Sequence, residues 1–188
     1  MTNTIYGIQY FEPFQIVSWQ KVYGHLYDKA SDVFNPPYDS FIEALLPAVN
    51  YPADLAKLPA VSTVPAKARD AVFSPSYLAD FDSNPNNATI MAAKKQDLLG
   101  WDPKAPTTLC SGSGDPTVKF SINAQALYDD FRSRGGVNVT LVDVDAKIKQ
   151  MYGSVLSADQ ESFYVNYHGT YEAQLCTAEA RKLFDQWK

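Results

Sequence analysis

The sequence predicts an α/β fold in which a helical region is followed by a strand–helix–strand–helix unit of a parallel sheet. Residues 107–110 and 137–144 are short apolar runs rich in β-branched residues, a composition typical of buried strands. Residues 117–134 between them have the periodicity of a helix, which a Gly-Gly pair ends. A strand, a helix and a second strand in this order indicate a parallel βαβ unit.

The composition sets broad limits on function. The chain has 188 residues, enough for a sizeable core, and its hydrophobic content of 46% and charged content of 20% are ordinary for a globular protein. A net charge of −5, without a basic cluster among the aromatic residues, argues against nucleic-acid binding. No apolar run reaches the roughly 18 residues of a transmembrane helix, and residues 1–4 carry no basic region of a signal peptide.

The region before the first strand is predicted to be mostly helical. We expect residues 1–13 to be irregular or extended, with residues 5–11 as a strand or a docked leader. Residues 14–27 form the strongest helical pattern, because apolar residues recur there near helical spacing. Ser40 is expected to cap a short helix through residue 46, which Pro47 ends.

Further short helices are predicted over residues 65–71, 74–80 and 84–99. Proline and alanine are frequent in residues 50–65, which we expect to be loops with short helical turns. A Ser-Pro pair and an Asn-Pro pair begin the last two helices, and Gly100 ends the last one.

Asp115 is the first candidate site residue. It follows the turn Ser-Gly-Ser-Gly after the first predicted strand, and Pro116 then occupies the first position of the predicted helix. Asp115 is thus expected to be an N-cap residue at the carboxyl end of a strand. Open α/β sheets bind their ligands at that end.

His168 is the second candidate. The chain has two histidines. His25 lies within the first predicted helix, which favours a packing role or a surface position. His168 lies in a predicted Tyr-His-Gly loop, where an imidazole could face a cleft. The last predicted helix follows this loop and runs to residue 187. Glu172 follows closely and is expected to cap that last helix.

Together these motifs resemble the C-terminal part of the α/β-hydrolase superfamily. Residues 112–118, Gly-Ser-Gly-Asp-Pro-Thr-Val, match the Gly-x-x-Asp-x-x-Val pattern around the acid of that family, and residues 167–169 match its histidine loop. The sequence is similar to secreted bacterial esterases and lipases that carry a helical cap. The resemblance implies a partial α/β-hydrolase fold: an N-terminal segment over residues 1–13, a cap over residues 14–100 and the C-terminal core over residues 101–188.

The same resemblance implies a function. Asp115 would be the acid and His168 the base of a Ser-His-Asp triad that hydrolyses a small-molecule or lipid ester, without a cofactor. It also implies a secreted or periplasmic location, although this sequence shows no signal peptide. Asp143 and Asp145 form an Asp-x-Asp pattern that can suggest a metal, but a solvated strand end explains it, and no metal is expected.

The family's nucleophile motif, Gly-x-Ser-x-Gly, does not occur, because no two glycines stand four positions apart. Ser111 and Ser113 lie beside the acid and are not on a strand–turn–helix elbow. The nucleophile is therefore unassigned, and we expect the isolated chain to be inactive or nearly so. The alternative is a non-catalytic binding module. In either case a small sheet leaves an open edge, which favours a homodimer or an N-terminal partner that carries the nucleophile.

The two cysteines admit two interpretations. Cys110 ends the first predicted strand, and Cys176 follows His168 by eight residues. Both are expected near the carboxyl edge of the sheet, where they would form a disulfide beside the site or remain buried free thiols. Their spacing does not fit a zinc site.

Overall fold

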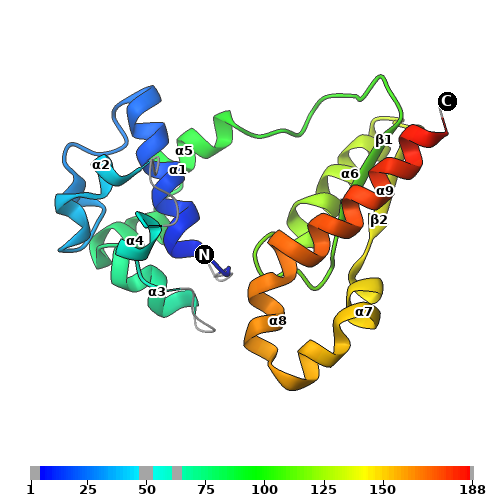
Figure 1. The fold of residues 1–188 in the computed structure, drawn as a ribbon. Coiled ribbons are helices and arrows are strands. Elements are labelled where there is room, and N and C mark those ends of the chain that lie inside the picture. The colour runs from blue at the N-terminus through cyan, green and yellow to red at the C-terminus, as the bar shows by residue number, and fades with distance from the viewer. Residues whose placement is uncertain (1–4, 47–52, 61–64, 187–188) are drawn as a thin grey trace. The chain divides into compact units, whose positions relative to one another are not determined.

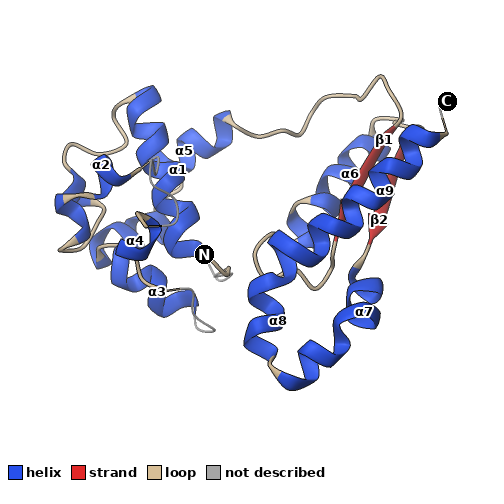
Figure 2. Cartoon of the chain, in the orientation of Figure 1, coloured by secondary structure: helices blue, strands red, loops and turns tan. Residues whose placement is uncertain are grey.

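The computed structural model describes residues 5–46, 53–60 and 65–186. The chain divides into two compact units, Met1–Asp97 and Leu98–Lys188. Figure 2 shows that both strands belong to the second unit. None of the helices in the described ranges has the length and apolar character needed to span a bilayer.

The described part of the first unit consists of helices and loops. Its helices are α1 (Ile8–Tyr23), α2 (Ile42–Leu45), α3 (Pro65–Val72), α4 (Pro75–Ser83) and α5 (Ala88–Lys95). Short 3-10 turns lie at Ala30–Asp32, Tyr38–Ser40 and Leu55–Lys57.

Two distant segments meet in the core of this unit. Phe34 and Phe73 form an antiparallel bridge, and their rings lie 5.5 Å apart. The backbone N–H of Asn35 donates to the carbonyl of Val72 at 2.8 Å, and the N–H of Ser74 donates to that of Val33 at 2.8 Å. Both phenylalanines are almost fully buried, so the bridge lies within the hydrophobic core.

Helix α1 corrects the expectation for the N-terminal segment. The helix starts at Ile8, so residues 8–13 are helical and not extended. Pro13 lies inside the helix, where it costs one backbone hydrogen bond without ending it. The helix ends at Tyr23 because Gly24 and His25 both have positive φ angles, of 60° and 67°. His25 therefore lies beyond the helix and is exposed.

Two other helices of this unit, α4 and α5, begin where a side chain accepts hydrogen bonds from their first N–H groups. Ser74 accepts a hydrogen bond from the N–H of Tyr77 and caps α4, as its position in the sequence indicates. Asn87 caps α5 in place of the predicted Asn84. Ser40 caps no helix, because its hydroxyl donates to the carbonyl of Pro37. The predicted stop at residue 47 lies outside the described residues.

The second unit contains the sheet. Strands β1 (Thr107–Ser111) and β2 (Val139–Asp143) pair in parallel, with Leu109 opposite Leu141. Helix α6 (Ala124–Ser133) connects them. The chain continues through α7 (Asp145–Ala158), α8 (Gln160–Asn166), the π-helical segment Tyr167–Glu172 and α9 (Ala173–Asp185). The predicted α/β fold class is confirmed: the chain is mostly helical with a small parallel sheet.

Helices lie on both faces of the strands. Figure 1 shows α9 in front of β1 and α6 behind it. A buried cluster fills the space between the strands and the last helices, and Cys110 and Val142 pack against it. Its fully buried members include Ile148, Phe163 and Tyr167.

Two local predictions for this unit are wrong. No helix begins at Thr117, because Lys119 adopts an extended backbone with ψ of 115° and α6 starts only after Asn123. His168 does not lie in a loop, because the backbone is helical without a break from Gln160 to Asp185. Gly169, which suggested a loop, is accommodated in the π-helical segment.

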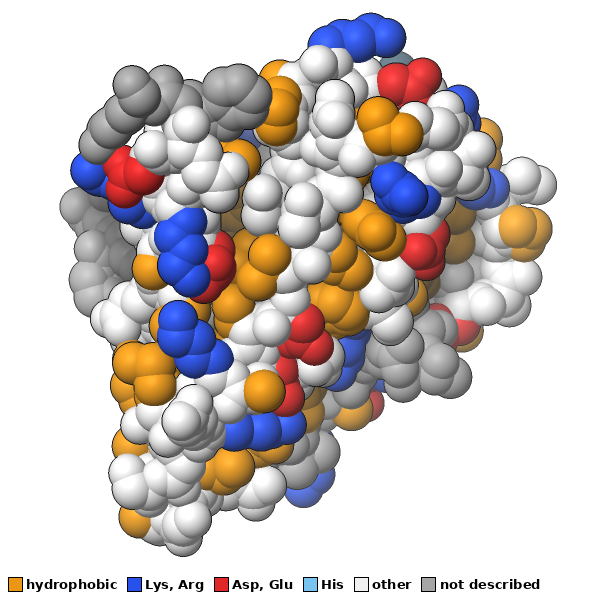
Figure 3. All heavy atoms as spheres, turned by 90° about the vertical axis from the view of Figure 1, so that its right-hand side faces the viewer, with side chains coloured by type: hydrophobic (Ala, Val, Ile, Leu, Met, Phe, Trp, Pro, Cys, Tyr) orange, Lys and Arg blue, Asp and Glu red, His pale blue; other side chains and the backbone are white. Residues whose placement is uncertain are grey.

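The surface charge agrees with the composition. On the face drawn in Figure 3, acidic and basic side chains are interspersed among apolar ones, and neither sign gathers into a large patch. This distribution fits the modest net charge of −5.

Candidate active site

Asp115 lies in the loop that follows β1, and its side chain is fully buried. One carboxylate oxygen, Oδ1, accepts hydrogen bonds from the backbone N–H groups of Thr117 at 2.7 Å and Val118 at 3.1 Å. This local pattern is that of an Asx turn, and it fixes the orientation of the carboxylate although no helix begins here.

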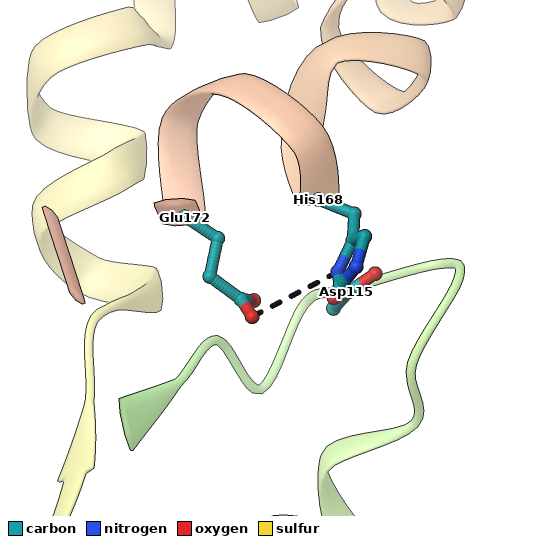
Figure 4. A group of neighbouring side chains, drawn as sticks. All are labelled: Asp115, His168 and Glu172. Atoms are coloured by element: carbon teal, nitrogen blue, oxygen red, sulfur yellow. Dashed lines mark hydrogen bonds and ion pairs between the residues drawn. The ribbon is translucent and has the colours of Figure 1, made fainter. Parts of the chain in front are cut away.

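The other oxygen of Asp115 contacts His168. Oδ2 lies 2.6 Å from Nδ1 of the imidazole (Figure 4). Because a carboxylate can only accept, Nδ1 carries the proton and Nε2 is left for other partners. The His168 side chain is 41% exposed, whereas that of Asp115 is 0% exposed. The structure thus joins a buried carboxylate to a partly exposed imidazole.

The pKa values of the two groups move apart. Burial by itself raises the pKa of Asp115, but the hydrogen bonds from His168, Thr117 and Val118 outweigh it and lower that pKa overall. The hydrogen bond to Asp115 raises the pKa of His168, and the partial burial of the ring opposes this. Asp115 is therefore ionised at neutral pH and stabilises an imidazolium beside it.

Glu172 is a further member of the site. It lies one helical turn after His168 and is 7% exposed. Its Oε2 accepts the backbone N–H of Gly112 at 2.8 Å, and its Oε1 accepts the hydroxyl of Ser111 at 3.3 Å. Its predicted role as a helix cap is wrong, since its carboxylate is bonded to Ser111 and Gly112. Residues 112–118, which carry Asp115, are called the acid loop below. The spacing of four residues from His168 is the one signal that could have revealed it.

The two glycines of the acid loop allow a close approach of other side chains. A Cβ atom at Gly112 would overlap the hydroxyl of Tyr167 and lie 3.0 Å from Oε2 of Glu172. A Cβ atom at Gly114 would overlap the carboxylate of Asp145. Tyr167 in turn donates its hydroxyl to Oδ1 of Asp145 at 2.7 Å. Only glycine fits at these two positions without movement of the packed side chains.

Asp143 holds the same loop from the end of β2, and Asp145 begins α7 two residues later. Oδ1 of Asp143 accepts the backbone N–H groups of Ser113 and Asp145, each at 2.9 Å. Asp145 is buried, and Lys149 donates to its Oδ2 at 2.6 Å. The expectation of a solvated strand end is therefore wrong for Asp145. The carboxylate of Asp143 fixes the loop, whereas that of Asp145 is bonded to Tyr167 and Lys149.

The two cysteines lie close together. The structure joins Cys110 of β1 to Cys176 of α9 by a disulfide, with their Cα atoms 5.6 Å apart. The bridge links the strand that leads into the acid loop to the helix that continues from the histidine.

Neither serine of the loop is placed as a nucleophile. Ser111 is buried and its hydroxyl is bonded to Glu172. Ser113 is exposed, on a turn and not on a strand–helix elbow. The structure therefore pairs a carboxylate with an imidazole, and neither Ser111 nor Ser113 beside them has the geometry of a nucleophile elbow.

Asp115, His168 and Glu172 also have the chemistry of a metal-binding group, since their ligand atoms lie within 4.8 Å of one another. However, the oxygens of both carboxylates already accept hydrogen bonds from the backbone, Ser111 and His168. A cation would have to displace these bonds, so the group fits a hydrogen-bonded network better than a metal site.

Neither a family model nor a curated protein sequence matches this chain. The similarities are to solved structures, and these are esterases. A crystal structure of the rice cell wall degrading esterase LipA from Xanthomonas oryzae is 28% identical, with a TM-score of 0.66, over 87% of this chain and 42% of the LipA chain. A ligand-bound form of LipA is also 28% identical, with a TM-score of 0.64, over 83% and 40%.

This chain spans about two-fifths of the length of LipA. The matched 83% of this chain exceeds either of its units, so residues of both units take part in the similarity. The similarity supports an esterase-like fold.

Proposed function

We propose that this chain provides the acid and the base of a serine carboxylesterase. The observation that carries the proposal is the 2.6 Å contact between Oδ2 of the buried Asp115 and Nδ1 of the partly exposed His168. This is the orientation that a Ser-His-Asp triad requires, because the acid binds one imidazole nitrogen and leaves the other for proton transfer.

The proposed chemistry follows from that orientation. A serine hydroxyl attacks the carbonyl carbon of the ester, and Nε2 of His168 takes the proton from the hydroxyl. The imidazolium then gives this proton to the departing alcohol, and a water molecule repeats the sequence on the acyl-enzyme. Asp115 holds the tautomer and stabilises the imidazolium, and its lowered pKa keeps it charged during the reaction.

The serine is proposed to come from a different polypeptide segment. The sequence has no Gly-x-Ser-x-Gly motif, and the oxyanion hole of such enzymes includes the N–H after the nucleophile. We accordingly propose that the chain by itself hydrolyses esters little or not at all. Incubation with p-nitrophenyl butyrate and a fluorophosphonate label should yield neither turnover nor a labelled serine.

The proposal also covers the role of the first unit, the class of substrate and the location of the enzyme. The helical first unit would serve as a cap, and the substrate would be a small-molecule or lipid ester. The Cys110–Cys176 disulfide supports a secreted or periplasmic location, because disulfides persist in oxidising compartments.

A non-catalytic binding module is the second candidate. Within the described residues the sheet has only β1 and β2, so each strand has an outer edge without a strand partner. Such edges favour pairing with another chain, either a second copy or an N-terminal segment. Sedimentation of the chain alone at increasing concentration distinguishes these two partners. A homodimer would form without any added protein, whereas pairing with an N-terminal segment would require that segment.

A chimaera tests the catalytic proposal. This chain would replace the matched part of LipA, and hydrolysis of p-nitrophenyl butyrate would be measured. We expect activity that His168→Ala abolishes, because no other imidazole of this chain contacts a buried carboxylate in the described residues.

His25→Ala is the matched control, since His25 is exposed and lies in the first unit. It should leave the rate unchanged. A folded chimaera without esterase activity, or one as active with His168→Ala as with His25→Ala, would refute the catalytic role. Circular dichroism and a cooperative melt establish that the variants are folded.

A further inference from the structure

Glu172 connects the two parts of the candidate site. Its side chain comes from the π-helical segment that also carries His168, and it reaches the loop that carries Asp115 (Figure 4). Its Oε2 accepts the N–H of Gly112, the third residue before Asp115, and its Oε1 accepts the hydroxyl of Ser111. The carboxylate of Glu172 thus links the acid loop to the π-helical segment that carries His168.

The local backbone suits this connection. Residues four apart on a helix lie on the same face, so His168 and Glu172 point together towards the loop. The π-helical segment Tyr167–Glu172 places both within one turn, and such segments are frequent at functional sites. At Gly112 the absence of a side chain lets Oε2 reach the backbone N–H.

Glu172 also affects the charge at the imidazole. Its Oε1 lies 3.9 Å from Nδ1 of His168, which already contacts Asp115. The titratable groups that face Glu172 are Asp115 and His168, together with the hydroxyl of Tyr167. Two carboxylates therefore flank one imidazole, and an ionised Glu172 adds a second negative charge beside it.

We propose that Glu172 is a positioning residue of the Asp115–His168 pair: its carboxylate holds the acid loop against the helix, and its charge increases the proton affinity of His168. This role deepens the proposed esterase function and depends on it only for its catalytic consequence. The physical claim concerns the pair itself and is measurable without any ester.

The charge of Glu172 depends on pH. Burial and the neighbouring charge of Asp115 raise the pKa of Glu172 to about 7. Glu172 is thus mostly neutral below this pH and mostly ionised above it. Its effect on His168 is consequently strongest on the alkaline side of neutrality.

Nuclear magnetic resonance titration of the His168 ring tests the inference in the intact chain. Glu172→Gln keeps the shape and an acceptor for Gly112 but removes the charge. We expect the pKa of His168 to fall by about 0.5–1 unit, which is the effect of one charge at this distance under strong solvent screening. Glu161→Gln on α8, which is exposed, is the control for loss of one charge and should leave that pKa unchanged.

A second variant tests the hold on the loop. Glu172→Ala removes the acceptor, so the amide of Gly112 should lose its protection from hydrogen exchange, whereas Glu172→Gln should retain most of it. An unchanged His168 pKa in Glu172→Gln, or a Gly112 amide that is equally protected in Glu172→Ala, overturns the inference.

The chimaera separates this inference from the proposed function. If the pKa of His168 shifts as expected but the folded chimaera is inactive, the esterase proposal fails and the positioning role stands. If the chimaera is active, Glu172→Gln should lower the apparent pKa of kcat/KM by the same amount. If the chimaera is active but Glu172→Gln leaves the apparent pKa of kcat/KM unchanged, the positioning role is contradicted and the esterase proposal is not.

Discussion

Asp115 uses its two carboxylate oxygens for different purposes. Oδ1 is held by two backbone N–H groups of its own loop, and Oδ2 holds the imidazole of His168. Because the first set of bonds fixes the carboxylate independently of the histidine, Asp115 is preorganised to bind the imidazole in one tautomer. The side chain itself is completely buried, which strengthens both interactions.

The charge of Asp115 should be visible in the titration of His168. Asp115→Asn preserves Oδ1 as an acceptor for Thr117 and Val118 but replaces the charged partner of the imidazole. The pKa of His168 should therefore fall, since the bond to Asp115 is the largest cause that raises it. The ring of His25 gives an internal reference in the same spectra. An equal His168 pKa in both proteins would show that the contact does not persist in solution.

Glu172 should make stability depend on pH. Burial raises the pKa of Glu172 from its ordinary value of 4.5 to about 7 in the folded chain, so the folded state binds this proton more tightly. The stabilisation is then complete below pH 4.5 and is lost as pH rises through about 7. Relative to Glu172→Gln, the wild-type chain should lose about 1–3 kcal/mol of unfolding free energy over this interval.

Urea unfolding of both proteins at several pH values measures this difference. Burial also raises the pKa of Glu12 to about 7. Because Glu12 is present in both proteins, its contribution to the pH dependence of stability cancels in the comparison. A difference between the two proteins that is constant with pH would mean that folding leaves the pKa of Glu172 unchanged.

At the scale of single elements, the acid loop is stabilised from three sides. Glu172 binds it from the helix after His168, Asp143 binds it from the end of β2, and Tyr167 packs against its glycines. These contacts bring together segments about 30 to 60 residues apart in the sequence. The loop is consequently a product of the tertiary structure and not of its own turn propensity.

Gly112→Ala tests how tightly the loop is packed. The added methyl would overlap the hydroxyl of Tyr167, so we expect a loss of about 1–3 kcal/mol of stability. Gly153→Ala on α7 is the matched control, because nothing lies within 4 Å of its added methyl. This second change should stabilise the helix by up to about 1 kcal/mol. Equal stabilities of the two variants in urea would contradict the packing described for the loop.

The disulfide ties β1 to α9 across 66 residues of sequence. Removing it by the double change Cys110→Ser and Cys176→Ser should lower the free energy of unfolding by about 2–4 kcal/mol, because the unfolded chain regains the entropy of a long loop. A thiol titration of the denatured, unreduced protein should find no reactive thiol. Two reactive thiols would mean that the cysteines are unpaired in solution.

The elements with strong local signals were predictable from the sequence. The β-branched runs indicated β1 and β2, and the glycine-rich turn before Asp115 indicated a loop at the carboxyl end of a strand. The helical state of His168 was not predictable, because Gly169 resembles a loop residue and the π-helical segment depends on packing of Tyr167. Glu172 was missed as a site residue for a similar reason, since its partners lie far away in the sequence.

At the scale of the whole molecule, the chain corresponds to about two-fifths of LipA. Within the described residues its sheet has two strands, and its candidate site has a carboxylate and an imidazole without a serine elbow. Both features motivate the proposal that further polypeptide completes the sheet and supplies the nucleophile.

The value of kcat/KM for p-nitrophenyl butyrate, measured for the LipA chimaera with and without Asp115→Asn, tests the central claim most directly. The claim is that Asp115 and His168 act as one acid–base unit. It predicts that Asp115→Asn lowers kcat/KM by about 10³–10⁴-fold while the chimaera remains folded. A folded Asp115→Asn chimaera that retains the kcat/KM of its parent would contradict the claim.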